Sequence, residues 1–353
     1  MLDTDIQNLT APPPRVFTTR TATADPALEA TVIDRMPLLY TEGPDPALDR
    51  PAHVRAGSGL CWMGDRLALV QDDVNFIAVV EGGGSTVRAL VLPAGAGGRR
   101  QFDDRRGNKA MKLDLEACAA VSHEGATLVL AFGSGTTPRR EQVAIVSGWE
   151  EDRLAVQLRH VPALYAALRR DTGFAGGEMN VEGAAQVGDV IRLFGRGNGR
   201  PRDGLRPVNA TCDLPCAALL RHLIDPDGAP PPAPTAVVRY ELGSLDGIPL
   251  GFTDACCWGE ALLFSAAAED SPDVVLDGPV KGSVIGVIDE NGSVRYAPLT
   301  QRSGARERRF AGKVEGLAPR DSAAARLYAV VDCDDPAVPS ELCTVELRGA
   351  WGE

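Results

Sequence analysis

The sequence predicts an all-β fold, and three observations lead to that prediction. Gly and Pro are frequent, with 38 and 26 residues among 353, and such a turn-rich composition favours many short strands over long helices. A segment of similar pattern recurs five times along the chain. A second apolar run follows each of these segments, in most cases across a short hydrophilic or Gly-containing turn. Together these features indicate antiparallel sheets built from a repeated unit.

Each recurring segment contains one oxygen-bearing side chain, then Gly or Ala, then two small or apolar residues. The five segments are residues 56–62, 114–120, 180–186, 252–258 and 313–319. Their oxygen-bearing residues are Ser58, Glu116, Glu182, Asp254 and Glu315, which are 58, 66, 72 and 61 residues apart. A mean period of about 64 residues suits a four-stranded unit with long loops. The sequence therefore predicts a single β-propeller of five four-stranded blades over residues 1–353.

The other elements follow in order within each unit. The predicted second strands are Arg66–Val70, Thr127–Phe132, Val190–Phe194, Ala261–Ser265 and Arg326–Val331. Third and fourth strands are predicted, for example, at Gln142–Ser147, Leu154–His160, Ser283–Asp289 and Val294–Leu299. Two helical segments, Pro162–Arg170 and Pro215–Ile224, interrupt the pattern, and the Pro-rich residues 225–235 are expected to form a loop.

The ends of the chain are expected to meet in the last unit. Residues 313–353 have room for only three strands. The N-terminal strand Arg15–Thr21 is therefore expected to supply the outermost strand and to close the ring, which leaves no long exposed edge. A sixth blade built from residues 15–50 is the alternative. Residues 1–14 are expected to form a flexible tail.

Charge and cysteine usage narrow the expected partners and compartment. The chain has 36 Lys and Arg against 48 Asp and Glu, a net charge of −12, which disfavours nucleic acids and anionic membranes as partners. No segment reaches the ~18 apolar residues of a membrane-spanning helix. The eight cysteines are thinly spread without metal or redox spacing, and no signal peptide is evident. A reducing cytoplasm is therefore expected.

The oxygen-bearing residues of the repeats are expected to meet in the central channel, because the first strand of each blade lines it. Four carboxylates so confined raise each other's pKa values unless a cation neutralises them. An all-oxygen ligand set favours Ca²⁺, with Mg²⁺ as the alternative. The predicted ligands are Ser58, Glu116, Glu182, Asp254 and Glu315. In a second interpretation these acids cap backbone amides or pair with Lys112, Lys281, Lys313 and Arg196.

Polar loops after the second strands are expected to rim the same mouth. They are residues 71–73, 134–140, 196–199, 269–277 and 332–335. One hypothesis is a binding propeller with a small-molecule or protein ligand at the mouth. The other is a metal-dependent hydrolase of phosphate esters, with Asp72 or Asp332 as base and with Arg139, Arg140 or Arg196 as the phosphate clamp. Arg196 is expected to be exposed at the mouth and to contribute little to stability.

Several strings resemble an uncharacterised family of bacterial propeller proteins. They are KLDLEA (112–117), FGSGTTPRR (132–140), NVEGAA (180–185), FTDA (252–255), AAEDSPDVVLDGPVKGS (267–283), KVEGLA (313–318) and DCDDP (332–336). More distantly, the chain is similar to the esterase-like domain linked to phytases and to the calcium-activated nucleotidases (apyrases), five-bladed propellers with a channel calcium held by Ser and Glu. That resemblance implies a calcium site at Ser58, Glu116, Glu182 and Glu315. Asp254 departs from the pattern, and no nucleotide-binding residues match.

Overall fold

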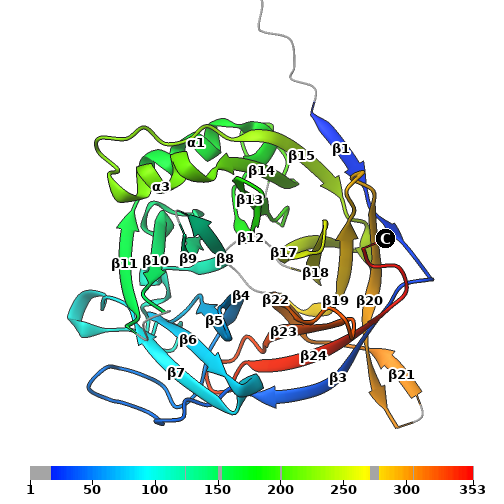
Figure 1. Cartoon of the computed structure of the whole chain (residues 1–353), viewed down its shortest axis with the longest axis horizontal. Coiled ribbons are helices and arrows are strands. Elements are labelled where there is room, and N and C mark those ends of the chain that lie inside the picture. Colours follow the sequence, from blue (N-terminus) through cyan, green and yellow to red (C-terminus); the bar gives the residue numbers. More distant parts are fainter. Residues whose placement is uncertain are drawn as a thin grey trace, which may run out of the picture.

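The computed structural model describes residues 17–123, 125–149, 153–198, 201–270, 278–304 and 306–352. Strands dominate this part of the chain, and its helices are few and short. The all-β prediction is therefore confirmed. The described strands form four hydrogen-bonded sheets. In Figure 1 the strands are stacked outward from a common centre, which is a propeller-like arrangement.

Three of the sheets are separate from one another, and each is antiparallel in its main strands. The first contains β4 (Gly57–Met63), β5 (Arg66–Gln71), β6 (Phe76–Glu81) and β7 (Thr86–Val91). The second contains β8 (Leu115–His123), β9 (Ala126–Gly133), β10 (Gln142–Ser147) and β11 (Ala155–His160). The third contains β12 (Val181–Val187), β13 (Val190–Gly195), β14 (Asn209–Pro215) and β15 (Thr235–Glu241), with β1 (Thr18–Thr21) parallel to β15.

The fourth sheet is the largest, because β3 (Glu29–Pro37) joins two groups of strands. One group is β16 (Ser244–Leu245), β17 (Ile248–Trp258), β18 (Ala261–Glu269), β19 (Val280–Ile288) and β20 (Val294–Ser303). The other is β22 (Lys313–Asp321), β23 (Arg326–Asp332) and β24 (Glu341–Arg348). β3 runs parallel to β20 and antiparallel to β24. Two short strands, β2 (Thr23–Ala24) and β21 (Arg306–Arg309), also pair with β20.

Helices cover the periphery of the second and third sheets (Figure 1). They are α1 (Pro162–Arg170), α2 (Thr172–Ala175) and α3 (Cys216–Ile224), so both predicted helical segments are confirmed. Leu168 of α1 and Leu219 of α3 are buried in one core cluster with residues of both sheets. Short 3-10 helices lie at Gly82–Gly84, Ala96–Gly98, Lys109–Met111 and Pro138–Arg140. None of the described helices has the length and apolar character needed to cross a membrane.

The innermost strands are β4, β8, β12, β17 and β22, and they meet around the centre (Figure 1). β8 contacts β4 and β12, while β17 contacts β12 and β22, and β22 in turn contacts β4. The five recurring segments of the sequence lie on or beside these strands. The strands therefore bring residues that are distant in sequence into one ring.

The N-terminal strand does not close the last sheet, contrary to the prediction. Thr18–Thr21 pairs with β15, whereas residues 15 and 16 lie outside the described residues. The outer neighbour of β24 is β3, in which Ala30 and Val32 are buried in a core cluster. The side chains of Thr18–Thr21 are polar and largely exposed, so only β3 offers apolar surface to the core. The described part of residues 15–50 joins sheets formed by other segments and makes no separate sheet.

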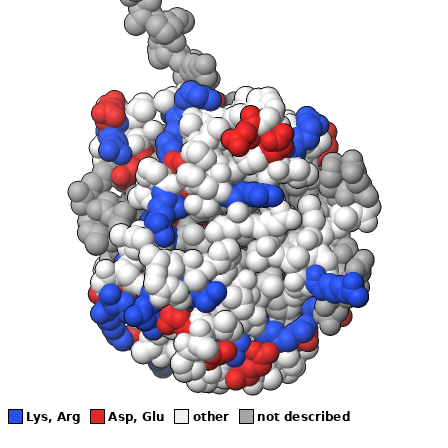
Figure 2. All heavy atoms as spheres, turned by 90° about the vertical axis from the view of Figure 1, so that its left-hand side faces the viewer, with Lys and Arg blue, Asp and Glu red and all other residues white. Residues whose placement is uncertain are grey.

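The surface on the left side of Figure 1 carries charges of both signs. Figure 2 shows Lys and Arg side chains interspersed with Asp and Glu over this face. The concentration of negative charge lies instead in the cavity at the centre of the ring.

Candidate metal and ligand site in the central cavity

A cavity of about 410 Å³ lies at one end of the ring of inner strands, a size within the range of small-molecule sites. Eight Asp and four Glu residues line it, against three Arg and three Lys. Acidic side chains thus outnumber basic ones by two to one. This excess of acidic side chains attracts positive charge.

A β-bulge near the start of an inner strand turns one side chain into this cavity. In β8 the pairing with β9 skips one residue, so Glu116 is left unpaired. The same irregularity leaves Ser58, Glu182 and Glu315 unpaired in β4, β12 and β22. A bulge inserts one extra residue and redirects its side chain. All four side chains line the cavity.

Small residues after the bulge allow the inner strands to approach closely. A Cβ at Gly183 would lie 3.1 Å from the backbone nitrogen of Ala255 in β17. A Cβ at Gly316 would lie 3.0 Å from the backbone carbonyl carbon of Gly59 in β4. A larger side chain at either position would force neighbouring strands apart in a close-packed centre. This approach brings the unpaired polar residues to a common cavity.

Asp254 does not join this ring, contrary to the prediction. In β17 the bulge falls at Thr253, whose hydroxyl donates to Ser265 Oγ at 2.8 Å. Asp254 occupies the next position and accepts a hydrogen bond of 2.7 Å from the backbone N–H of Leu317. It is fully buried, outside the cavity lining, and burial raises its pKa well above its usual range. A register difference of one residue moves a strand side chain to the other side.

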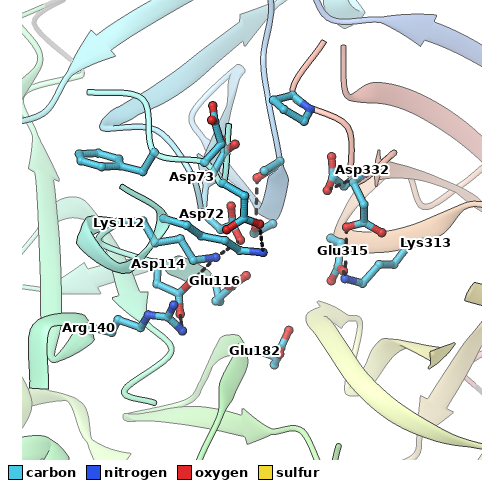
Figure 3. Close-up of a pocket in the computed structure, with 18 of the residues that line it drawn as sticks. Asp72, Asp73, Lys112, Asp114, Glu116, Arg140, Glu182, Lys313, Glu315 and Asp332 are labelled. Atoms are coloured by element: carbon cyan, nitrogen blue, oxygen red, sulfur yellow. Dashed lines mark hydrogen bonds and ion pairs between the residues drawn. The ribbon is translucent and has the colours of Figure 1, made fainter. Parts of the chain in front are cut away.

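One wall of the cavity, here called the Asp114 wall, consists of Asp72, Asp114, Glu116, Lys112 and Arg140 (Figure 3). One carboxylate oxygen from each of the three acids lies within 4.8 Å of the others. Lys112 Nζ is 2.5 Å from Asp72 Oδ2 and 2.6 Å from Asp114 Oδ1. Arg140 is 2.9 Å from Asp114 Oδ2. Glu116 has no hydrogen bond or ion pair with any described residue, so this wall has one carboxylate in excess.

The opposite side, here called the Lys313 wall, contains a larger excess of acid (Figure 3). Its members are Glu182, Glu269, Glu315, Asp332, Asp334, Arg196 and Lys313. Lys313 Nζ lies 2.7 Å from Glu315 Oε1 and 3.2 Å from Glu269 Oε2. Arg196 lies 2.7 Å from Glu269 Oε2 and 3.5 Å from Glu182 Oε1. Five carboxylates here face two cationic side chains.

Two carboxyls that make no ion pair with a described residue have raised pKa values. Burial, followed by the charges of Asp114 and Asp72, raises the pKa of Glu116 well above its usual range. Burial, followed by the charge of Asp334, does the same to the pKa of Asp332. The hydrogen bond to Asp332 comes from the backbone N–H of Asp334, at 3.2 Å. Both carboxyls therefore need a proton or a bound cation for charge balance.

The paired carboxyls differ according to the strength of their pairing. Burial raises the pKa of Glu182 to about 8, although Arg196 opposes the shift. Asp114 is also buried, but Lys112 and Arg140 hold its pKa below the usual value. Asp114 has two cations close by, with Lys112 at 2.6 Å and Arg140 at 2.9 Å. Glu182 has Arg196 at 3.5 Å, and the charges of Glu315 and Glu269 raise its pKa further.

The three arginines predicted to clamp a phosphate have different surroundings. Arg139 is exposed, donates its Nε–H to the backbone oxygen of Met111 at 2.8 Å and is absent from the cavity lining. Arg140 and Arg196 line the cavity, but both are buried and paired with carboxylates. Arg196 is only 4% exposed, so its predicted exposure is wrong. Its side chain turns inward because it pairs with Glu269 at the end of β18.

Of the other predicted site residues, some line the cavity and some do not. Asp72 and Asp332 both line the cavity. Among the predicted pairing cations, Lys112, Lys313 and Arg196 make ion pairs there, whereas Lys281 is exposed and outside the lining. Gly199, Asp273 and Asp277 of the predicted rim lie outside the described residues. Sequence reasoning missed Asp114, although its place two residues before Glu116 in the same repeat was a usable signal.

A second, smaller pocket of about 260 Å³ lies at the other end of the inner strands. Its lining is mainly Ala, Leu and Pro, with Cys61, Cys118, Cys256 and Cys257. All eight cysteines of the chain are free, and six are buried. Of the buried cysteines, Cys61, Cys118 and Cys256 lie on inner strands, where they fill small apolar positions at the crowded centre.

A known protein family covers all five repeats. The family described as "Family of unknown function (DUF6929)" matches residues 53–347. The chain belongs to the DUF6929 family. The matched residues include every inner strand and both walls of the cavity. Membership in DUF6929 names no activity, and no curated protein matches the chain.

Solved structures resemble this DUF6929 chain only loosely. Myxococcus xanthus glutaminyl cyclase is 13% identical, with a TM-score of 0.38, over 95% of this chain and 99% of that one. The PQQ-bound aldose sugar dehydrogenase of Streptomyces coelicolor is 13% identical, with a TM-score of 0.44, over 92% and 100%. Bacillus subtilis arabinanase Arb43A is 10% identical, with a TM-score of 0.39, over 83% and 94%. These scores are too low to bear on activity. None of the three is a phytase-linked or nucleotidase propeller, so that resemblance stays a prediction.

Proposed function

We propose that this DUF6929 protein is a five-bladed β-propeller that binds one hard divalent cation and a small ligand in its central cavity. The mutual contacts of the five inner strands support the blade count, and the pairing of β3 with β24 and β20 supports closure of the ring. The net charge of −12 supports a partner other than nucleic acid or an anionic membrane. The eight free cysteines support a reducing compartment such as the cytoplasm.

The convergence of Asp72, Asp114 and Glu116 carries the metal part of the proposal. Their ligand atoms lie within 4.8 Å of one another, and Glu116 makes no ion pair with any described residue. Each carboxylate offers about four lone-pair sites, so Asp72 and Asp114 retain acceptor capacity beside Lys112. Because all donors on this wall are oxygens, the set favours Ca²⁺ or Mg²⁺ over Zn²⁺.

Calorimetric titration with Ca²⁺ and with Mg²⁺ tests the metal site. We expect binding heat with at least one ion. A ligand present at 100 times its Kd adds roughly 2.7 kcal/mol to the free energy of unfolding, so the ion should also raise the melting temperature and a chelator should reverse the rise.

A charge-removing variant locates the ion. Glu116→Gln keeps the shape of the side chain but removes one ligand charge, and it should weaken ion binding roughly tenfold or more because affinity depends on the ligand charge count. Glu260→Gln is the matched control, since Glu260 is exposed in the turn after β17. Absence of heat with both ions would remove the metal site, and equal affinity in Glu116→Gln and wild type would place it elsewhere.

The cavity supports ligand binding better than hydrolysis of phosphate esters. Among the lining arginines, Arg140 and Arg196 are buried in ion pairs with carboxylates, and the exposed Arg105 pairs with Asp335 at 3.1 Å. Arg139 is outside the lining. A phosphate would therefore meet a negative surface in which each of the three lining arginines already pairs with a carboxylate. Asp332 faces the Asp114 wall with a raised pKa, which is the observation that favours a catalytic base. Turnover of an aryl phosphate with bound ion, lost in Asp332→Asn, would favour the hydrolase.

A further inference from the structure

The Lys313 wall contains more negative charge than its own cations balance. Lys313 and Arg196 make ion pairs with four of its five carboxylates, and Asp332 makes none with a described residue. When these groups are ionised, the wall has an excess of three negative charges inside a partly enclosed cavity. Like charges so confined are unfavourable unless a cation enters. A bound cation would therefore balance negative charge that Lys313 and Arg196 leave uncompensated.

A second metal ion does not suit this wall. Among the described residues, Asp72, Asp114 and Glu116 are the set whose ligand atoms come within 4.8 Å of one another. Around Lys313 no three described acids bring their ligand atoms within that distance, whereas the ligands of Ca²⁺ or Mg²⁺ lie about 2.0–2.6 Å from the ion. A cation that donates several hydrogen bonds, with N···O distances of about 2.7–3.2 Å, suits such spacing better.

Unpartnered acceptors in the lining provide an independent indication of a ligand. Glu315 is 5% exposed and lines the cavity, and its Oε2 has no hydrogen-bond partner among the described residues. Asn198 also lines the cavity with its Oδ1 buried and unpartnered. A buried acceptor without a donor costs roughly 1–3 kcal/mol, so both atoms would gain from a ligand that donates hydrogen bonds.

The wall already accommodates one alkylammonium group, that of Lys313. Its Nζ contacts Glu315 Oε1 at 2.7 Å, Glu269 Oε2 at 3.2 Å and Asp334 Oδ1 at 3.7 Å. An ammonium group is compact and presents three donors in a tetrahedral arrangement. The same surroundings suit a second ammonium placed between Glu315 and Asp332.

We propose that the Lys313 wall is the ligand subsite of the cavity and that it binds the ammonium group of a small aliphatic amine. Glu315 Oε2 and the Asp332 carboxylate accept hydrogen bonds from this ammonium, and the rest of the ligand extends into the 410 Å³ cavity toward the Asp114 wall. The inference rests on the proposed ligand-binding role of the cavity, but it does not depend on a bound metal ion.

Titration calorimetry with three four-carbon probes tests the amine site. The probes are 1,4-diaminobutane, 1,4-butanediol and succinate, which differ in charge but little in length. We expect the diamine to bind in the presence of a chelator and the other two to give no heat. Raising the salt concentration should weaken diamine binding, because screening reduces attraction between charges. Equal binding of diamine and diol would overturn the proposal.

Two conservative variants locate the amine. Glu315→Gln and Asp332→Asn should each weaken diamine binding about tenfold or more, which corresponds to ~1.4 kcal/mol, and Glu260→Gln should leave it unchanged. Circular dichroism of each variant verifies folding. If either variant fails to fold, the other variant and the salt dependence still decide the question. Diamine affinity unchanged by every folded wall variant would overturn the assignment.

A repeat of the titration with saturating calcium separates the two proposed sites. Diamine binding that persists beside calcium supports a separate subsite, whereas competition between them would place the diamine on the Asp114 wall and overturn the inference. Calcium binding without diamine binding would refute the amine site and leave the metal site standing. Diamine binding without calcium binding would refute the metal site and leave the amine site standing.

Discussion

Arg196 is the most informative residue for testing how the Lys313 wall is held together. Its guanidinium is 4% exposed and lies 2.7 Å from Glu269 and 3.5 Å from Glu182. Arg196→Met retains most of the side-chain length and removes the charge. Glu269 then keeps Lys313 at 3.2 Å. Among the described residues, Glu182 keeps the hydrogen bond from Asn180 but no ion pair. One buried carboxylate is left without a cation.

The expected cost follows from that uncompensated charge. Removal of one partner of a buried ion pair typically costs about 3–5 kcal/mol, because the other charge stays desolvated. The loss should be largest above pH 8, where Glu182 is ionised, since burial raises its pKa to about 8 even in the presence of Arg196. A second change, Glu182→Gln, should recover part of the loss because it removes the stranded charge.

Urea unfolding followed by fluorescence of the four Trp residues measures the free energies of unfolding. The matched control is Arg139→Ala, an exposed arginine of the same charge whose Nε–H contacts a backbone oxygen. The control should change stability by no more than about 0.5 kcal/mol. A cost below about 1 kcal/mol for Arg196→Met, or one equal to that of the control, would refute the buried ion-pair network.

Two further predictions concern pH and the N-terminal strands. With a chelator present, the free energy of unfolding should fall as pH rises from about 5 to about 8, because folded Glu182, with its pKa raised to about 8, binds a proton that the unfolded side chain releases near pH 4.5. Urea titrations across that range test the sign, and rising stability would contradict it. Val32→Asp should destabilise the protein by roughly 3 kcal/mol or more, because Val32 is buried in β3 where the strand pairs with β24. Deletion of residues 1–22, which removes the exposed β1 but leaves β3, should cost less, and melting curves in which the deletion costs more would show that β1 closes the ring.

The sequence by itself determined the fold class and the positions of the inner strands. Hydrophobic alternation, turn residues and small residues act over a few neighbours, so they are readable without the rest of the chain. The same local signal singled out Ser58, Glu116, Glu182 and Glu315, which all line the cavity and each lie just before the small residue at a bulge. Both helical segments were predictable for the same reason.

The tertiary structure decided which charges meet and which strand closes the ring. Asp254 shares the sequence pattern of the ring residues, but the bulge in β17 falls at Thr253, and a shift of one residue directs Asp254 to the backbone of β22. Arg196 and Glu269 are 73 positions apart, and only the packing of neighbouring strands buries them together. Ion pairs of this kind depend on distances between elements and on exclusion of water, which no local pattern in the sequence records.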